Sequence, residues 1–157
     1  MQQHKTYTVD EATRLLENYC AYQERCHKEV EQKLYDLKMI PEAKEQIILH
    51  LMQHNFLNEE RYAKSYARGK FNIKKWGKIK VANDLKFKNI SAYNIKTALK
   101  EINDEDYYNN LQTIATKKLK LIKEPNSFKK RNKLATFLIS KGYESNLVFE
   151  LVNSLIS

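Results

Sequence analysis

Residues that break helices are scarce in this sequence. Its 157 residues include only three glycines and two prolines. A many-stranded sheet, or a series of strand–helix units, needs more of both residues for its turns. Lysine, glutamate, leucine and alanine, which favour helices, are abundant. The composition therefore predicts an all-α protein.

Cysteines and long apolar runs are also few. No apolar run approaches the roughly 18 to 20 residues that span a bilayer, and the first residues, Met1 to Lys5, do not begin a signal-peptide hydrophobic region. Cys20 and Cys26 are six residues apart on what reads as one helix, where their side chains would point about 240° apart. We expect no disulfide between them. Reduced thiols suit the cytosol, so we expect a cytoplasmic protein that does not enter the membrane.

Motifs of catalytic and cofactor sites are missing as well. Gly69, Gly77 and Gly142 are too far apart to form a phosphate-binding loop, and no nucleophile elbow is present. His50 and His54 have a spacing that can grip a metal, but no third ligand is evident. We expect no enzyme, no cofactor and no bound metal.

Positive charge is concentrated in the middle of the chain. The net charge is +9. Residues 58–103 carry 12 basic and 4 acidic side chains, against 7 and 9 in residues 1–57 and 9 and 6 in residues 104–157. Between Arg61 and Lys88 the only acid is Asp84. This imbalance predicts a polyanionic or acidic partner, although a solvated lysine-rich surface would show the same pattern.

Apolar residues at helical spacing mark nine helices in three groups of three. Thr8 and Glu11 have the spacing of a capping box, and Pro41, Asn58 and Ser91 suit the starts of later helices. We place the modules at residues 1–57, 58–103 and 104–157. Such short units joined in series predict an elongated, curved array of three tandem three-helix modules, with little contact between the first and the third.

The three groups repeat with a period of about fifty residues. We superpose Ile40, Ile90 and Tyr143, which aligns Leu49 with Leu99 and Val152, and Met52 with Ile102 and Leu155. Asn89 and Gly142, just before two of the anchors, suit a left-handed helix end. Met39 does not suit that conformation, so the register of the first junction stays open.

The middle of the chain resembles the central signature of the RecX family. The resemblance rests on Phe56 to Ala63 (FLNEERYA), Lys75-Trp76-Gly77-Lys78 and Asp84 to Ile90 (DLKFKNI). The family consists of bacterial regulators built from tandem three-helix modules. The resemblance implies binding to RecA recombinase, in the groove of its filament on DNA, and modulation, usually inhibition, of recombination and repair. The outer modules match by spacing more than by motif.

Candidate binding residues come from the basic stretch and from a second cluster in the third module. Trp76 suits stacking on a base or packing between helices, and Arg61 suits a partner contact or an ion pair. Phe56, Leu57, Tyr62 and Ala63 are most simply packing residues. The candidates are Arg61, Arg68, Lys70, Lys74, Lys75, Trp76, Lys78, Lys80, Lys86, Lys88, Lys129, Lys130, Arg131 and Lys133.

Two functions fit these residues. The first is a regulatory protein, monomeric by our expectation, that binds the RecA filament and binds single- or double-stranded DNA weakly and without sequence preference. The alternative is an autonomous helical DNA-binding protein, also indifferent to sequence. Residues 92–102 expose only Asn94, Lys96, Thr97 and Lys100, too few polar side chains for base reading.

Overall fold

The computed structural model describes residues 5–157, and within that range every regular element is a helix. The first group is α1 (Val9–Tyr22), α2 (His27–Asp36) and α3 (Pro41–Gln53). The second is α4 (Glu59–Gly69), a π-helical segment η1 (Lys70–Lys74), α5 (Lys78–Phe87) and α6 (Ala92–Leu99). The third is α7 (Asp104–Leu121), α8 (Ser127–Ser140) and α9 (Ser145–Leu155). The predicted all-α class is confirmed.

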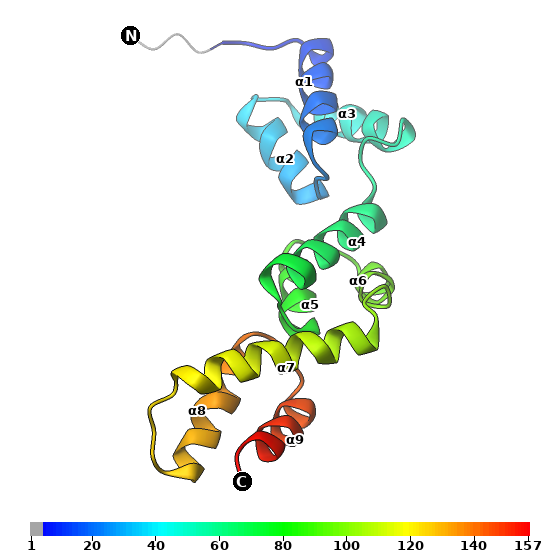
Figure 1. Cartoon of the computed structure of the whole chain (residues 1–157). Helices are drawn as coiled ribbons and strands as arrows, with labels where there is room; N and C mark the ends of the chain where they lie inside the picture. Colours follow the sequence, from blue (N-terminus) through cyan, green and yellow to red (C-terminus); the bar gives the residue numbers. More distant parts are fainter. Residues whose placement is uncertain (1–4) are drawn as a thin grey trace, which may run out of the picture.

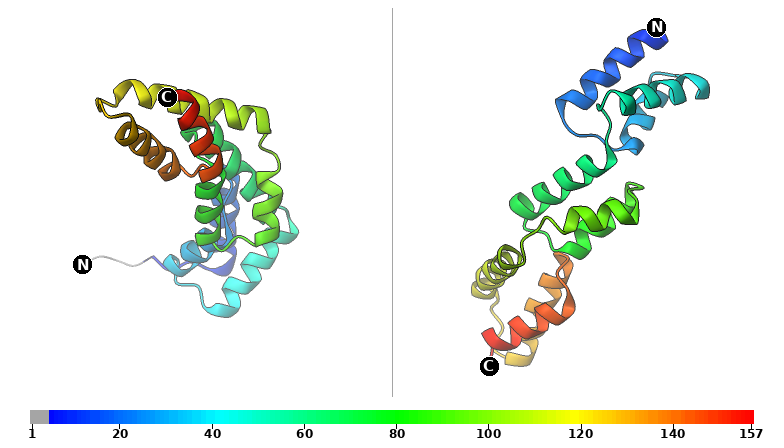
Figure 2. Two further views of the ribbon diagram at one scale, coloured as in Figure 1. Left: turned by 90° about the horizontal axis from the view of Figure 1, so that it is seen from below. Right: turned by 90° about the vertical axis from the view of Figure 1, so that its right-hand side faces the viewer.

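The three groups follow one another along an elongated molecule. In Figure 1, α1 to α3 lie at one end, α4 to α6 in the middle, and α7 to α9 at the other end. The right-hand view of Figure 2 shows the same order, with the first and third groups separated by the second. The predicted tandem arrangement of three-helix modules is therefore confirmed. No helix among residues 5–157 is both long enough and apolar enough to cross a membrane.

Each group of helices encloses its own hydrophobic core, and three buried residues cross between groups. Leu16, Val30 and Ile47 belong to the first core, while Cys26, which precedes α2, is buried in the middle core with Tyr62 and Leu85. Phe71 of η1 and Ile102, which precedes α7, are likewise buried in the third core, where Phe71 lies beside Tyr107. Adjacent modules are therefore joined by shared packing, and the boundaries at residues 58 and 104 remain our proposal.

Local capping explains why several helices begin where the sequence predicted. Thr8 and Glu11 form the reciprocal capping box of α1. The Asn58 side chain accepts the Arg61 backbone N–H at 2.9 Å, the Ser91 hydroxyl accepts the Asn94 N–H at 3.2 Å, and Pro41 occupies the first turn of α3. Each cap satisfies a donor that the helix leaves unpaired.

The predicted register is wrong by one residue in the first module. The N–H of Met39 donates to Leu34 O, as that of Ile90 donates to Leu85 O and that of Tyr143 to Leu138 O. Met39, not Ile40, is thus the counterpart of Ile90. The left-handed residue before it is Lys38 (φ 60°), which corresponds to Asn89 (φ 64°) and Gly142 (φ 98°).

The corrected register also corrects the predicted core of α3. Leu49 and Met52, which we aligned with core residues, are about half exposed, at 53% and 49%. Their neighbours Ile48 and Leu51 take those places, and Leu51 is fully buried. Because a lysine holds the left-handed position, the usual glycine or asparagine signal was missing there.

The two cysteines do not share a helix, contrary to our expectation. Cys20 lies in the last turns of α1, which ends at Tyr22, and Cys26 is the N-cap residue of α2. Both are buried free thiols. Burial raises both pKa values, that of Cys20 to about 11.

Candidate interface on the middle module

The turn at residues 74–80, part of the basic stretch, forms the joint between the middle and third modules. Lys75 follows η1 as its C-cap in the left-handed conformation (φ 57°), and the Lys75 carbonyl accepts the Tyr143 hydroxyl at 2.7 Å. The Gly77 N–H donates to Lys141 O at 2.7 Å, and the Ile79 N–H to Gly142 O at 3.0 Å. The turn is therefore fixed by the α8–α9 connection and is not a free loop.

Two glycines make this close approach feasible. A Cβ atom on Gly77 would overlap the backbone of Gly142 and Tyr143, and one on Gly142 would overlap Lys80. Tyr107 seals the joint, because its hydroxyl accepts the Lys78 N–H at 2.9 Å and donates to Glu144. Burial raises the pKa of the Tyr107 hydroxyl, which keeps it a donor.

Aromatic rings and lysines alternate along one face of α4 and α5. Lys70 Nζ lies 5.3 Å from the Tyr66 ring and 4.7 Å from the Trp76 ring; Lys80 Nζ lies 4.4 Å from Trp76, and Lys88 Nζ 5.7 Å from Tyr66. Trp76 is partly exposed while packing against the middle core. We call these five residues, Tyr66, Lys70, Trp76, Lys80 and Lys88, the lysine–aromatic ladder.

The ladder lysines carry uncompensated charge. Within residues 5–157, no carboxylate forms an ion pair with Lys70, Lys80 or Lys88. The contact between a lysine and an aromatic ring stabilises an exposed site by only about 0.5–1 kcal/mol. These lysines can therefore exchange the rings for a phosphate group. The ladder therefore offers both of the features that bind single strands, cations and stackable rings.

Four of the predicted candidates are held in ion pairs. Arg61 Nε lies 2.8 Å from Glu24 of the first module, and Arg61 Nη2 donates to Asn55 O at 2.9 Å. The other three pairs are Arg68–Glu101 at 2.9 Å, Lys78–Asp104 at 3.6 Å and Lys133–Glu124 at 3.2 Å. The acid that pairs with Lys78 is distant in the sequence, because Asp104 stands at the start of α7.

The remaining candidates fall into two separate places. Lys74, Lys75 and Lys86 are exposed on the middle module. Lys129, Lys130 and Arg131 occupy the first turn and a half of α8, which begins at the end of the third module away from α4 and α5 (Figure 1). The sequence candidates thus do not converge on a single site.

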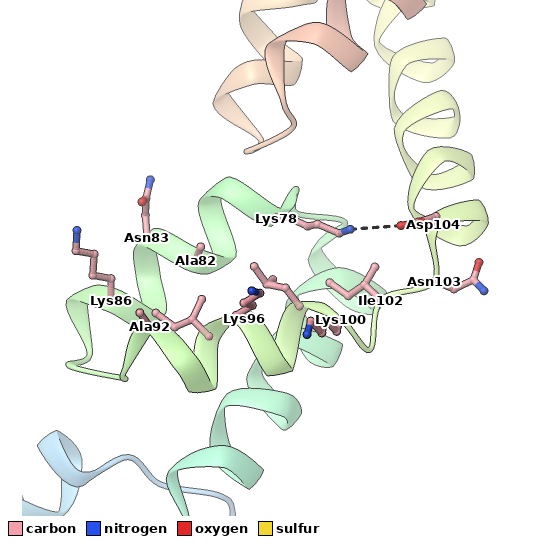
Figure 3. Close-up of a pocket in the computed structure, with 12 residues that line it drawn as sticks. Lys78, Ala82, Asn83, Lys86, Ala92, Lys96, Lys100, Ile102, Asn103 and Asp104 are labelled. Atoms are coloured by element: carbon pink, nitrogen blue, oxygen red, sulfur yellow. Dashed lines mark ion pairs between the residues drawn. The ribbon is translucent and has the colours of Figure 1, made fainter.

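An open groove of about 760 Å³ lies between α5 and α6 (Figure 3). Lys78, Lys86, Lys96 and Lys100 line it together with apolar side chains of both helices. The candidates chosen from the sequence include the first two lysines but not Lys96 and Lys100. The missing signal was available in the i, i+4 spacing of Lys96 and Lys100, which gives a helix a cationic edge.

The histidine pair is part of the first module. His50 Nε2 lies 2.9 Å from Glu17 Oε2, and the His50 and His54 rings are 4.3 Å apart. Within residues 5–157, no three His, Cys, Asp or Glu side chains are grouped so as to hold a metal ion.

Comparisons with known proteins identify the modules. Residues 58–99 match the family model described as RecX, second three-helix domain, and residues 104–152 match RecX, third three-helix domain. The "Regulatory protein RecX" of Clostridium botulinum strain Eklund 17B is 31% identical and that of Clostridium acetobutylicum 28% identical, each over 85% of this chain and 63% of the relative. The chain thus spans somewhat less than two thirds of these relatives.

Solved structures agree on the fold. The crystal structure of RecX from Lactobacillus salivarius superposes with a TM-score of 0.84 and 26% identity, over 94% of this chain and 96% of that one. A second crystal structure, of a regulatory protein RecX, has the same TM-score at 23% identity, over 93% of this chain and 73% of that one. With matching family models over both later modules, the chain belongs to the RecX family of regulatory proteins.

Proposed function

We propose that this protein binds RecA recombinase and its DNA filament and inhibits the recombinase in recombination and DNA repair. Membership of the RecX family carries the proposal. The concentration of unpaired lysines on the middle module supports it, because a nucleoprotein filament is a polyanion.

The lysine–aromatic ladder is the part of the surface that we assign to DNA. Its lysines would contact phosphates and Trp76 would stack on a base. None of these contacts reads base identity, so binding to DNA alone is weak and indifferent to sequence. Contacts with the recombinase itself must then supply the preference for the filament. The elongated molecule has three modules that could make such contacts.

Three parallel titrations test the proposal. The whole chain is titrated against recombinase alone, against oligothymidine alone, and against recombinase assembled on oligothymidine. We expect the tightest binding to the filament and a matching fall in its ATP turnover. Equal affinity for oligothymidine with and without recombinase, or unchanged ATP turnover at saturation, would instead support an autonomous DNA-binding protein.

A further inference from the structure

The groove between α5 and α6 combines an apolar lining with a cationic edge. Lys86, Lys96 and Lys100 are exposed along it, and within residues 5–157 none of them forms an ion pair. Lys78 is different, because it points to Asp104 (Figure 3). The apolar side chains that line the groove are Ala82, Ala92, Ile95, Leu99 and Ile102.

A ligand that fits must satisfy both features. A nucleic acid backbone would neutralise the lysines but would bring no apolar groups to Ile95 and Leu99. An amphipathic helix with carboxylates beside its apolar stripe satisfies both, because its apolar side chains fill the lining and its acids face the lysines. We propose that the α5–α6 groove is a docking site for an acidic amphipathic segment of a partner protein.

The first module provides an internal comparison. A groove of about 470 Å³ lies at the equivalent place, against α3, where Ile48 takes the place of Leu99. In the corrected register, Glu45 stands where Lys96 stands, and the groove is lined by two acids, Glu31 and Glu45, and one lysine, Lys44. The groove therefore recurs in the first module, whereas its row of unpaired lysines does not. Charge, not shape alone, selects the proposed ligand.

This inference does not depend on the proposed recombinase partner, and its test contains neither recombinase nor filament. The probe is a fluorescein-labelled peptide whose helix carries leucines along one face and glutamates beside them. A second peptide has the same composition with the leucines spread around the helix. Fluorescence anisotropy with the full chain measures both affinities, at low and at high salt.

The test variant is Lys86→Glu, Lys96→Glu and Lys100→Glu combined. We expect it to weaken peptide binding about tenfold or more, since attraction becomes repulsion along the groove. The matched control, Lys117→Glu, Lys120→Glu and Lys123→Glu, makes the same change in net charge at three exposed lysines on and just after α7. It should bind like the parent.

Folding and competition complete the experiment. Thermal melts show whether both variants fold. If the triple glutamate variant does not fold, a variant with glutamine at positions 86, 96 and 100 replaces it, and we expect this variant to weaken peptide binding by a smaller factor. Equal loss in the test and control variants, equal binding of the two peptides, or no saturable binding by the parent would overturn the proposal. The proposal would also be overturned if oligothymidine displaced the peptide and bound the test variant more weakly than the parent. The groove would then bind nucleic acid.

Discussion

At the scale of single residues, the family signature is largely a set of joints. Gly77 lets the middle module touch the backbone of the third, and Arg61 connects the middle module to Glu24 and to the end of the first. Phe56, Leu57, Tyr62 and Ala63, which we interpreted as packing residues, are buried or partly buried in the first two cores. The proposed binding contacts are therefore assigned to other residues around these joints.

Gly77→Ala should destabilise the protein by about 2 kcal/mol, because the added methyl meets backbone atoms that cannot rotate away. Gly69→Ala is the control: a methyl group there would meet no atom within 4 Å outside the backbone of its own helix, and alanine favours the helix by roughly 0.5–1 kcal/mol. Urea denaturation measures both. Equal effects of the two substitutions would show that the joint is loose in solution.

Arg61→Ala should cost about 1 kcal/mol of folding free energy, since it leaves Glu24 and the Asn55 carbonyl without their donor. Arg68→Ala should cost less than about 0.5 kcal/mol, because the Arg68 side chain is 55% exposed and its ion pair with Glu101 is weak in water. Denaturation curves compare the two. If Arg68→Ala proves the more costly, the proposed role of Arg61 as a link between modules fails.

Cys20 and Cys26 should react slowly with a thiol-specific dye at pH 8. Both are buried, and burial raises both pKa values, so little reactive thiolate is present and the dye has poor access. In urea the pKa values return to the ordinary range and both thiols should react quickly. Fast labelling of the native protein would contradict the shared packing of Cys26 in the middle core.

At the scale of elements, α5 and its C-cap residue Lys88 present lysines on two faces. Lys80 and Lys88 belong to the ladder, while Lys78 and Lys86 line the groove with α6. Lys80 follows Lys78 by two residues, and Lys88 follows Lys86 by two. Two residues turn a helix by about 200°, so the two sets point to nearly opposite sides. One short helix can therefore serve two ligands of different chemistry.

Trp76 can report which of these faces is occupied. It is the only tryptophan of the chain and lies between Lys70 and Lys80. Oligothymidine should quench its fluorescence, with log K falling against log salt at a slope of roughly −2 to −4 for three to five phosphate contacts. The acidic peptide should change it much less. Quenching by the peptide alone would reverse the assignment of the two faces.

Local signals in the sequence predicted most helices. Features that depend on contacts between residues far apart in the sequence could not be predicted. Thr8, Asn58 and Ser91 act through their own next turn, so their caps could be read directly. The pairing of Lys78 with Asp104 depends on how α7 packs against α5, which no local pattern reports. The left-handed Lys38 was missed because its conformation is fixed by the surrounding fold and not by a preference of lysine.

At the scale of the whole molecule, the order of the helix groups sets the dimensions. A compact chain of this length would have a radius of gyration of about 15 Å. The first and third groups lie at opposite ends (Figure 1), so we expect a clearly larger value from small-angle X-ray scattering. A value near 15 Å would mean that the modules fold back on one another in solution.

The residues that cross between cores also set an order of folding during synthesis on the ribosome. Residues 9–57 contain every buried side chain of the first core, whereas the middle core includes Cys26 of the preceding module and the third includes Phe71 and Ile102 of the middle one. Each later core therefore packs around a side chain that has already left the ribosome when the rest of that core is synthesised. Folding can follow the direction of translation, and a chain halted before α7 would leave the Phe71 ring without its neighbours and open to chaperones.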